Sequence, residues 1–334
     1  MNRRIIVAGG NGFFGSAAVE RLKTDKFSPV CASRSGEFKL DVENRGSIRA
    51  VLKPGDIVID CVGPFQDRTM ALVECAAEIG FDVIDISDSV AYCEKVLSKK
   101  VTNIRILTAC SSISAIPATF ITLSEIKNPV RISTFLAPET KYASRPGAGT
   151  SLLRSIGRKI KTFSNGKFEN RYGWRKIKRF RAPSPLGTLE CRQFETADAA
   201  TLPPVWPTLR DIDFWVDSRI PALNRFFEWS DKFGCTKFLE SSTLQKLFLP
   251  VIRILGPKGG AICVEIEGDG TIKRFSVTAG HKGYYTPIIP AVIAAENIAK
   301  DKFSERGVVP ADKQVNPGEL LAYLGRIGVK YSLL

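Results

Sequence analysis

A glycine-rich loop near the start of the chain limits the possible folds more than any other feature. Gly9, Gly10, Asn11, Gly12, Phe13, Phe14 and Gly15 follow an apolar run and open a helix-like segment that extends to Leu22. Glycines at this spacing permit a tight turn, let the backbone approach a pyrophosphate, and let helix and strand pack closely. The helix N-terminus then offers N–H groups to the phosphates. The sequence predicts dinucleotide binding here; a merely structural glycine turn is the alternative.

The end of the second apolar strand indicates which dinucleotide binds. NAD-specific sheets place an acidic residue there, which accepts a hydrogen bond from the ribose 2′-hydroxyl. This chain has Ser33, Arg34 and Ser35 instead, and its next carboxylate is Glu37. A guanidinium pairs well with a 2′-phosphate, and a serine hydroxyl can donate to it. We therefore expect NADP(H) to be preferred over NAD(H), unless Arg34 is an ordinary surface arginine.

Two further strand ends supply predicted cofactor contacts. Asp41 and Val42 follow the third strand and are expected to flank the adenine. A run of five residues follows the fourth strand, at the carboxyl edge where ligands lie in such sheets. That run is Cys61, Val62, Gly63, Pro64 and Phe65.

The alternation of strands and helices predicts the fold class, which is α/β. Up to about residue 127, apolar strands separated by amphipathic helices indicate an N-terminal Rossmann domain with a doubly wound parallel sheet. Residues 128–285 contain strand patterns without regular helices between them, and Gly268-Asp269-Gly270 is typical of a hairpin turn. They predict a second, α+β domain on a mostly antiparallel sheet, for substrate binding or dimerisation. Residues 286–334 are expected to form C-terminal helices that return to the Rossmann domain.

Charge and cysteine usage limit the location and the partners of the protein. The eight cysteines form no CxxC pair and the only histidine is distant from them, so neither a metal site nor a disulfide framework is expected. No apolar run is long enough to span a membrane, and the N-terminus leaves no room for a signal peptide. These features predict a cytoplasmic protein, with peripheral membrane association as the alternative.

The net charge of +14 is concentrated between Arg154 and Arg181. That basic block is compatible with a solvated face, an acidic substrate or an anionic membrane surface. Known nucleic-acid-binding motifs are lacking, so no nucleic-acid partner is expected. Aromatic residues between 203 and 233 and an apolar segment at 244–255 follow the block. They fit a buried core, a homodimer interface, or contact with a membrane or a hydrophobic substrate.

Several segments together resemble the saccharopine dehydrogenase-like oxidoreductases. They are the glycine loop, Asp41-Val42, the run 58–65, the strand end 83–88, the small-residue segment 109–118, and the segments 144–150 and 285–291. The resemblance is strongest up to about residue 120 and also includes a bacterial branch of the family. It implies a Rossmann domain, a second domain with an antiparallel sheet, and an NAD(P)-linked oxidoreductase. It does not imply saccharopine as the substrate.

Candidate catalytic residues follow from the need for a proton donor in the cleft beside the cofactor. Asp88 and Tyr92 come directly after the fifth strand, although capping of the next helix by Ser87 or Asp88 explains them equally well. His281 lies in a glycine-flanked loop, and Arg145 is a candidate clamp for a substrate carboxylate. The predicted protein is an NADP-dependent oxidoreductase with a small or hydrophobic substrate, and a homodimer. A non-catalytic nucleotide-binding protein that acts at a membrane surface is the alternative.

Overall fold

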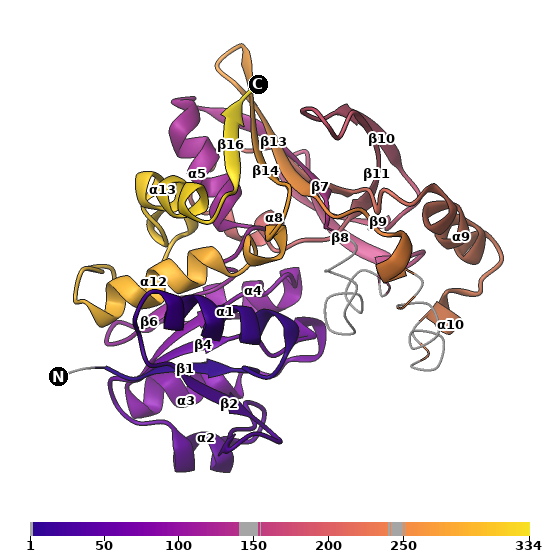
Figure 1. Ribbon diagram of the computed structural model, residues 1–334. Coiled ribbons are helices and arrows are strands. Elements are labelled where there is room, and N and C mark those ends of the chain that lie inside the picture. Colours follow the sequence, from indigo (N-terminus) through magenta and orange to yellow (C-terminus); the bar gives the residue numbers. More distant parts are fainter. Residues whose placement is uncertain (1–2, 140–152, 154, 240, 242–249, 251) are drawn as a thin grey trace. The chain divides into compact units, whose positions relative to one another are not determined.

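The structure is a computed structural model that describes residues 3–139, 153, 155–239, 241, 250 and 252–334 (Figure 1). The chain divides into two compact units, and each contains segments that are distant in sequence. The first unit comprises Met1–Thr119, Ala200–Val205 and Tyr285–Leu320. The second comprises Phe120–Ala199, Trp206–Tyr284 and Leu321–Leu334.

The first unit contains a parallel sheet of seven strands, which confirms the predicted Rossmann-like class. In spatial order the strands are β15 (Gly307–Val308), β6 (Arg105–Leu107), β5 (Asp82–Asp85), β4 (Ile57–Asp60), β1 (Ile5–Ala8), β2 (Val30–Ser33) and β3 (Phe38–Lys39). The chain leaves β1 toward β2 on one side, whereas β4, β5 and β6 follow one another on the other side. The loops after β1 and β4 therefore meet where the strand order reverses, which is the usual ligand position in open α/β sheets.

Helices cover both faces of this sheet. They are α1 (Phe13–Thr24), α2 (Arg45–Val51), α3 (Ala71–Ile79), α4 (Val90–Leu97) and α12 (Ile289–Ala299), with short helical turns η1 (Phe65–Asp67) and η3 (Ala311–Lys313). Helices α1 and α12 lie on one face, and α2 and α3 on the other (Figure 1). The central strands β1, β4, β5 and β6 are buried throughout, as Ile6, Ile57 and Ile59 show. Burial on both faces explains why these strands are continuously apolar.

The second unit is built on a mixed, mostly antiparallel sheet of nine strands, as predicted. Its main path runs β10 (Ile177–Arg181), β11 (Thr188–Phe194), β12 (Asp211–Val216), β7 (Pro129–Ala137), β13 (Gly260–Gly268), β14 (Thr271–Ala279) and β16 (Lys330–Leu333). Strands β8 (Lys159–Ser164) and β9 (Lys167–Tyr172) form a hairpin that joins the path where β8 pairs with β12. Among the described strands of this sheet, the parallel pair is β7 with β12.

The hairpin between β13 and β14 forms as its turn residues predict. Asp269 and Gly270 both have positive φ angles, of 49° and 72°, which glycine and aspartate tolerate better than most residues. The Asp269 carboxylate also accepts hydrogen bonds from the Lys127 and Asn128 backbone, at 2.7 and 3.2 Å. The turn is thus tied to the start of β7.

The remaining elements are short helices and connecting segments. They are α5 (Ala115–Ser124), α8 (Asp198–Thr201), α9 (Pro221–Lys232), α10 (Thr236–Leu239), η2 (Gly283–Tyr285) and α13 (Pro317–Arg326). The chain passes from one unit to the other at five places, which lie within α5, within α8, after Val205, within η2 and within α13. The segment predicted at 286–334 is accordingly divided: residues 321–334 belong to the second unit, because β16 pairs with β14 there. Most of the apolar segment 244–255 lies outside the described residues.

The packing of α1 against the end of β1 requires a glycine inside the helix. A Cβ atom at Gly15 would overlap the carbonyl oxygen of Gly9 and lie 2.6 Å from its carbonyl carbon. Helix α1 begins at Phe13 with Gly12 as its N-cap, and the Gly12 N–H donates to the Gly9 carbonyl oxygen at 2.7 Å. The first turn of α1 and the glycine loop are therefore packed tightly against each other.

We predict opposite effects for two glycine-to-alanine changes in helices. Alanine usually stabilises a helix interior relative to glycine by about 0.5–1 kcal/mol. Gly15→Ala should instead lower the free energy of unfolding by about 2 kcal/mol or more, because the methyl group displaces the loop. Gly325→Ala in α13, where an added Cβ meets nothing within 4 Å, is the matched control. Urea unfolding of both variants tests this, and a Gly15→Ala protein as stable as wild type would contradict the close approach.

Candidate functional site

The loop after β1 is shaped by contacts that leave no room for side chains at three of its glycines. A Cβ at Gly10 would lie 2.5 Å from the Cys31 sulfur, and one at Gly9 would lie 3.1 Å from the Cys61 carbonyl oxygen. Gly9 also has a positive φ of 73°. Gly15 is excluded by the overlap described above. At Gly12, by contrast, a Cβ would meet only the Gly9 carbonyl oxygen, at 3.0 Å, and otherwise points into open space.

The N-terminus of α1 has no internal partner of the kind that usually caps a helix. Its N-cap Gly12 has no side chain to accept from the first N–H groups, and the first turn contains no acidic residue. Helix N-termini attract anions because these N–H groups and the helix dipole point outward. With open space above Gly12, the loop fits a pyrophosphate held against the backbone.

The end of β2 lies beside this loop. The Gly10 N–H donates to the Ala32 carbonyl oxygen at 3.1 Å, and the Asn11 side-chain amide donates to the Ser33 hydroxyl at 2.9 Å. The predicted residues Asn11 and Ser33 are thus brought together. Arg34 and Ser35 are exposed at the tip that follows, and none of the described residues pairs with the Arg34 guanidinium.

The loop after β4 brings the predicted residues Cys61 to Phe65 next to the glycine loop. The Cys61 N–H donates to the Ala8 carbonyl oxygen at 3.0 Å, which continues the pairing of β4 with β1. Gly63 is exposed, whereas Phe65 is buried. Burial, with the neighbouring charge of Asp60, raises the pKa of the Cys61 thiol well above its usual range. Cys61 is therefore held as a neutral thiol rather than as a nucleophile.

A buried ion pair that the sequence analysis did not identify supports this loop. The Arg68 guanidinium lies 2.8 Å from an Asp60 carboxylate oxygen and donates to the Val62 carbonyl oxygen at 2.7 Å. Arg68 also pairs with Glu43, which follows the predicted residues Asp41 and Val42. Two strand-end loops are thereby linked through one arginine. In the sequence, the signal for this pair is an arginine eight residues after an acidic strand end. Such spacing is common, so it does not identify the pair.

Asp41 and Val42 occupy the loop between β3 and α2. Val42 is buried, and the Asp41 carboxylate accepts from the Glu43 N–H at 3.0 Å. The Asp41 N–H in turn donates to the Ser47 hydroxyl in α2. These bonds fix the loop locally, and the predicted contact of Asp41 and Val42 with adenine stays a prediction.

The predicted catalytic residues Asp88 and Tyr92 both lie beside the loop after β4. Asp88 is half-buried and accepts from the Gln66 side-chain amide at 3.3 Å. The Tyr92 ring packs edge-on against Phe65, with centroids 5.3 Å apart. The N-cap of α4 is Ser89, whose hydroxyl accepts from the Tyr92 N–H, so the suggested capping by Ser87 or Asp88 is wrong.

Tyr92, a candidate proton donor from its sequence position, is shielded from solvent. Its side chain is buried, and its hydroxyl has no hydrogen-bond partner among the described residues. Burial, reinforced by the charges of Asp85 and Asp60, raises the pKa of Tyr92 well above its usual value of about 10. The phenol is therefore held neutral beneath the loop.

Asp85 completes this buried polar layer at the end of β5. One carboxylate oxygen accepts from the Ser87 and Ala109 N–H groups at 3.0 and 2.8 Å, whereas the other is buried without a hydrogen-bond partner among the described residues. Burial raises the pKa of Asp85 to about 6, although the two N–H donors oppose that rise. Asp85 lies three residues before Asp88 and was not identified from the sequence.

The other predicted site residues belong to the second unit or lie outside the description. His281 is exposed in the loop after β14, and Arg145 lies outside the described residues. A group that the sequence analysis missed is hydrogen-bonded to the loop that contains His281. Glu139, just after β7, is buried and accepts from the Tyr284 N–H at 3.2 Å. Burial raises the pKa of Glu139 to about 7, so it is suited to proton exchange near neutral pH.

Metal chemistry and membrane spanning find no support among the described residues. No group of three or more histidine, cysteine, aspartate or glutamate residues in them is arranged to hold a metal ion. All eight cysteines are free. Within the part of the chain that the structure describes, no helix is long and apolar enough to cross a membrane.

Comparison with known proteins agrees with this geometry. Residues 5–109 match the family model described as "Saccharopine dehydrogenase NADP binding domain". The predicted resemblance is therefore confirmed for the part of the chain that contains the glycine loop, β2 and the loop after β4. None of the curated proteins matches the sequence.

Solved structures show more distant likenesses. The protein lin1944 from Listeria innocua is 20% identical over 24% of this chain and 54% of its own, with a TM-score of 0.19. This chain thus spans about half of its length. An amine dehydrogenase from Mycobacterium smegmatis is 10% identical over 95% of this chain and 98% of its own, with a TM-score of 0.46. A dehydrogenase (MviM) from Clostridium difficile is 10% identical over 98% and 99%, with a TM-score of 0.38.

The buried Asp85 carboxyl predicts a pH-dependent stability. Its pKa is near 3.8 when unperturbed and about 6 in the folded chain, so the folded state binds the proton more tightly. The corresponding stability is complete below about pH 4 and is lost as the pH rises through 6. Between pH 4 and 7, wild type should lose about 2–3 kcal/mol relative to Asp85→Asn, which stays neutral.

Chemical unfolding at a series of pH values measures this difference. Asp301→Asn, which removes an exposed carboxylate, is the control and should follow wild type. Parallel pH profiles for wild type and Asp85→Asn would show that Asp85 titrates normally.

Proposed function

We propose that this chain, whose residues 5–109 match a saccharopine dehydrogenase NADP binding domain, is an NADPH-dependent oxidoreductase. The observation that carries the proposal is the form of the Gly9–Gly15 loop. Contacts at Gly9, Gly10 and Gly15 leave no room for side chains there. The space above Gly12 is open, and no side chain of the described residues caps the helix N-terminus at this point. That combination fits a dinucleotide pyrophosphate better than a purely structural turn.

The residues around this loop have distinct roles in the proposed complex. The loop backbone and the N-terminus of α1 hold the pyrophosphate. Arg34, with Ser33 and Ser35, binds the 2′-phosphate, because an exposed guanidinium without a partner among the described residues is available for a charged hydrogen bond. Val62 to Phe65 form the edge along which the nicotinamide half extends. The Arg68–Asp60 pair holds that edge in place.

When bound, the nicotinamide supplies or accepts a hydride, and the protein orients the substrate and handles the proton. In the first unit, Asp88 is the group best placed for proton transfer, because it is half-buried beside the loop after β4. Tyr92 is better suited to supporting that loop, because its hydroxyl is buried and neutral. In the second unit, Glu139 is bonded to Tyr284 of the loop that contains His281, and these two residues, Glu139 and His281, are the candidate groups for a substrate-side proton.

The cofactor preference gives the sharpest test of this proposal. A ribose 2′-phosphate carries nearly two negative charges, and its pairing with a guanidinium is worth a few kcal/mol. NADPH should therefore bind about tenfold or more tightly than NADH. Arg34→Ala should weaken NADPH binding and leave NADH binding almost unchanged. Arg34→Asp should reverse the preference, because a carboxylate repels the phosphate and accepts from a free 2′-hydroxyl.

Fluorescence titration of both cofactors measures these affinities. Lys23→Ala removes the same charge at the other end of α1 and should change neither affinity appreciably. Equal affinities in wild type, or equal losses for both cofactors in Arg34→Ala, would contradict the assignment of Arg34 to the 2′-phosphate.

A further inference from the structure

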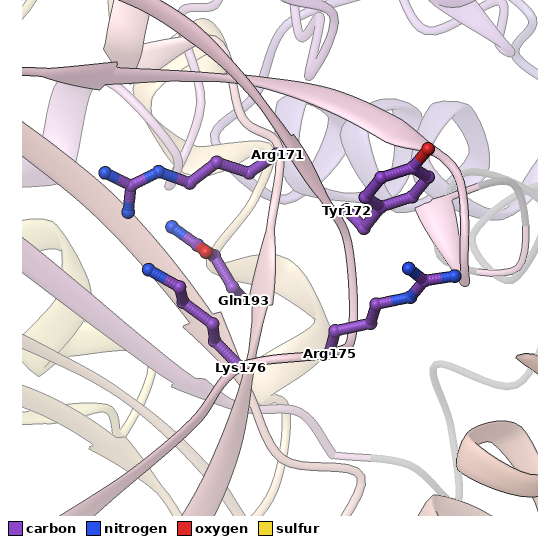
Figure 2. A pocket seen from close by; sticks show the side chains of 5 residues that line it. All are labelled: Arg171, Tyr172, Arg175, Lys176 and Gln193. Atoms are coloured by element: carbon purple, nitrogen blue, oxygen red, sulfur yellow. The ribbon is translucent and has the colours of Figure 1, made fainter. Parts of the chain in front are cut away.

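The basic block of the second unit forms a pocket that the proposed cofactor site does not use. The pocket has a volume of about 330 Å³ and is lined by Arg171, Tyr172, Arg175, Lys176 and Gln193 (Figure 2). Arg171 and Tyr172 end β9, Arg175 and Lys176 follow in the connection to β10, and Gln193 lies on β11. No acidic residue lines it.

Acidic side chains neutralise the two arginines of the pocket to different degrees. Arg175 donates two hydrogen bonds to the Asp231 carboxylate, at 2.7 and 3.0 Å, and lies over the Tyr172 ring at 4.1 Å. Its charge is therefore already paired. Arg171 donates through one terminal nitrogen to the Ser164 hydroxyl, at 2.9 Å, and to Glu169 at a longer 3.3 Å. The rest of its guanidinium remains available as a donor.

Lys176 contributes a charge that has no counterpart. Its side chain is exposed, and none of the described residues forms an ion pair or hydrogen bond with its ammonium group. In Figure 2 the ends of Arg171, Lys176 and Gln193 extend to the same side, whereas Tyr172 and Arg175 lie together on the other. The pocket therefore has one side where cationic donors gather.

Gln193 is the feature that distinguishes this pocket from an ordinary basic surface. Its side chain is 1% exposed, its Oε1 is buried, and its amide makes no hydrogen bond within the described residues. Its backbone is fixed by bonds with Lys176 and Trp174, at 3.2 and 2.9 Å, so the side chain is held in place. A buried amide without a partner is unfavourable and calls for an explanation.

We propose that this side of the pocket binds a phosphate monoester. Arg171, Lys176 and the amide nitrogen of Gln193 donate to its oxygens, which are numerous enough to accept from all three. A phosphate monoester is mainly dianionic near neutral pH and keeps no O–H for the buried Gln193 Oε1, so Gln193 contributes through its amide nitrogen. The phosphate belongs either to a small soluble molecule or to a lipid headgroup, since both present the same chemistry.

Calorimetric titration with glycerol phosphate, at constant ionic strength in chloride, tests the soluble source. Arg171→Gln and Lys176→Gln should each weaken binding about tenfold. Gln193→Leu should weaken it about fivefold without lowering stability, because it removes an unsatisfied buried amide. Arg179→Gln on β10 is the matched charge control, since Arg179 is exposed and does not line the pocket. Arg34→Ala should bind glycerol phosphate normally, which separates this pocket from the proposed cofactor site.

Co-sedimentation with phosphatidylcholine vesicles, with and without phosphatidate, tests the lipid source. Binding only to phosphatidate vesicles, lost in Gln193→Leu, would assign the phosphate to a lipid headgroup. Binding of glycerol phosphate in solution, lost in the same variant, would assign it to a soluble monoester. The proposal is overturned if neither probe binds, or if Arg179→Gln weakens binding as much as Arg171→Gln does.

Discussion

The close approach of α1 to the end of β1 is the constraint on which the rest of the first unit depends. Gly15 in the helix lies against the Gly9 carbonyl, and the Gly12 N–H closes the turn by donating to the same oxygen. This contact places the helix N-terminus directly at the carboxyl end of the sheet. It also sets the loop beside Cys31 in β2 and Cys61 directly after β4, the two strands that flank β1. A side chain at Gly9, Gly10 or Gly15 would separate elements that must touch.

Buried charged residues beneath the glycine loop fix the neighbouring loops at the end of the sheet. Arg68 neutralises Asp60 and reaches the Val62 carbonyl and Glu43, so that one buried guanidinium connects the loops after β3 and β4. Asp85 has no such cation and therefore titrates at a raised pKa of about 6. Asp60 is paired with an arginine and Asp85 is not, although both end neighbouring strands. This layer gives the candidate site a fixed frame, whereas Arg34 is exposed at the end of β2.

The sequence predicted those elements whose signals come from neighbouring residues. The glycine loop, the apolar parallel strands and the Asp269-Gly270 hairpin all carry signals within a few residues, and the structure contains each of them. Strand β15 has only two residues, and β16 is exposed throughout, so neither shows a strand pattern. Strand β8 does alternate buried and exposed positions, but its lysines suggested only a charged face. The Arg68–Asp60 pair and buried Glu139 depend on tertiary contacts, which no local pattern reports.

The central claim is that the cofactor pyrophosphate lies against the backbone at Gly12. Calorimetric titration of NADPH into Gly12→Val tests it most directly, because valine places a branched side chain in the open space above the loop. Gly325→Val, whose added Cβ meets nothing within 4 Å, is the control. NADPH affinity should fall about tenfold or more in Gly12→Val, which corresponds to about 1.4 kcal/mol, and should be unchanged in the control. Undiminished NADPH binding by a folded Gly12→Val protein would contradict the account.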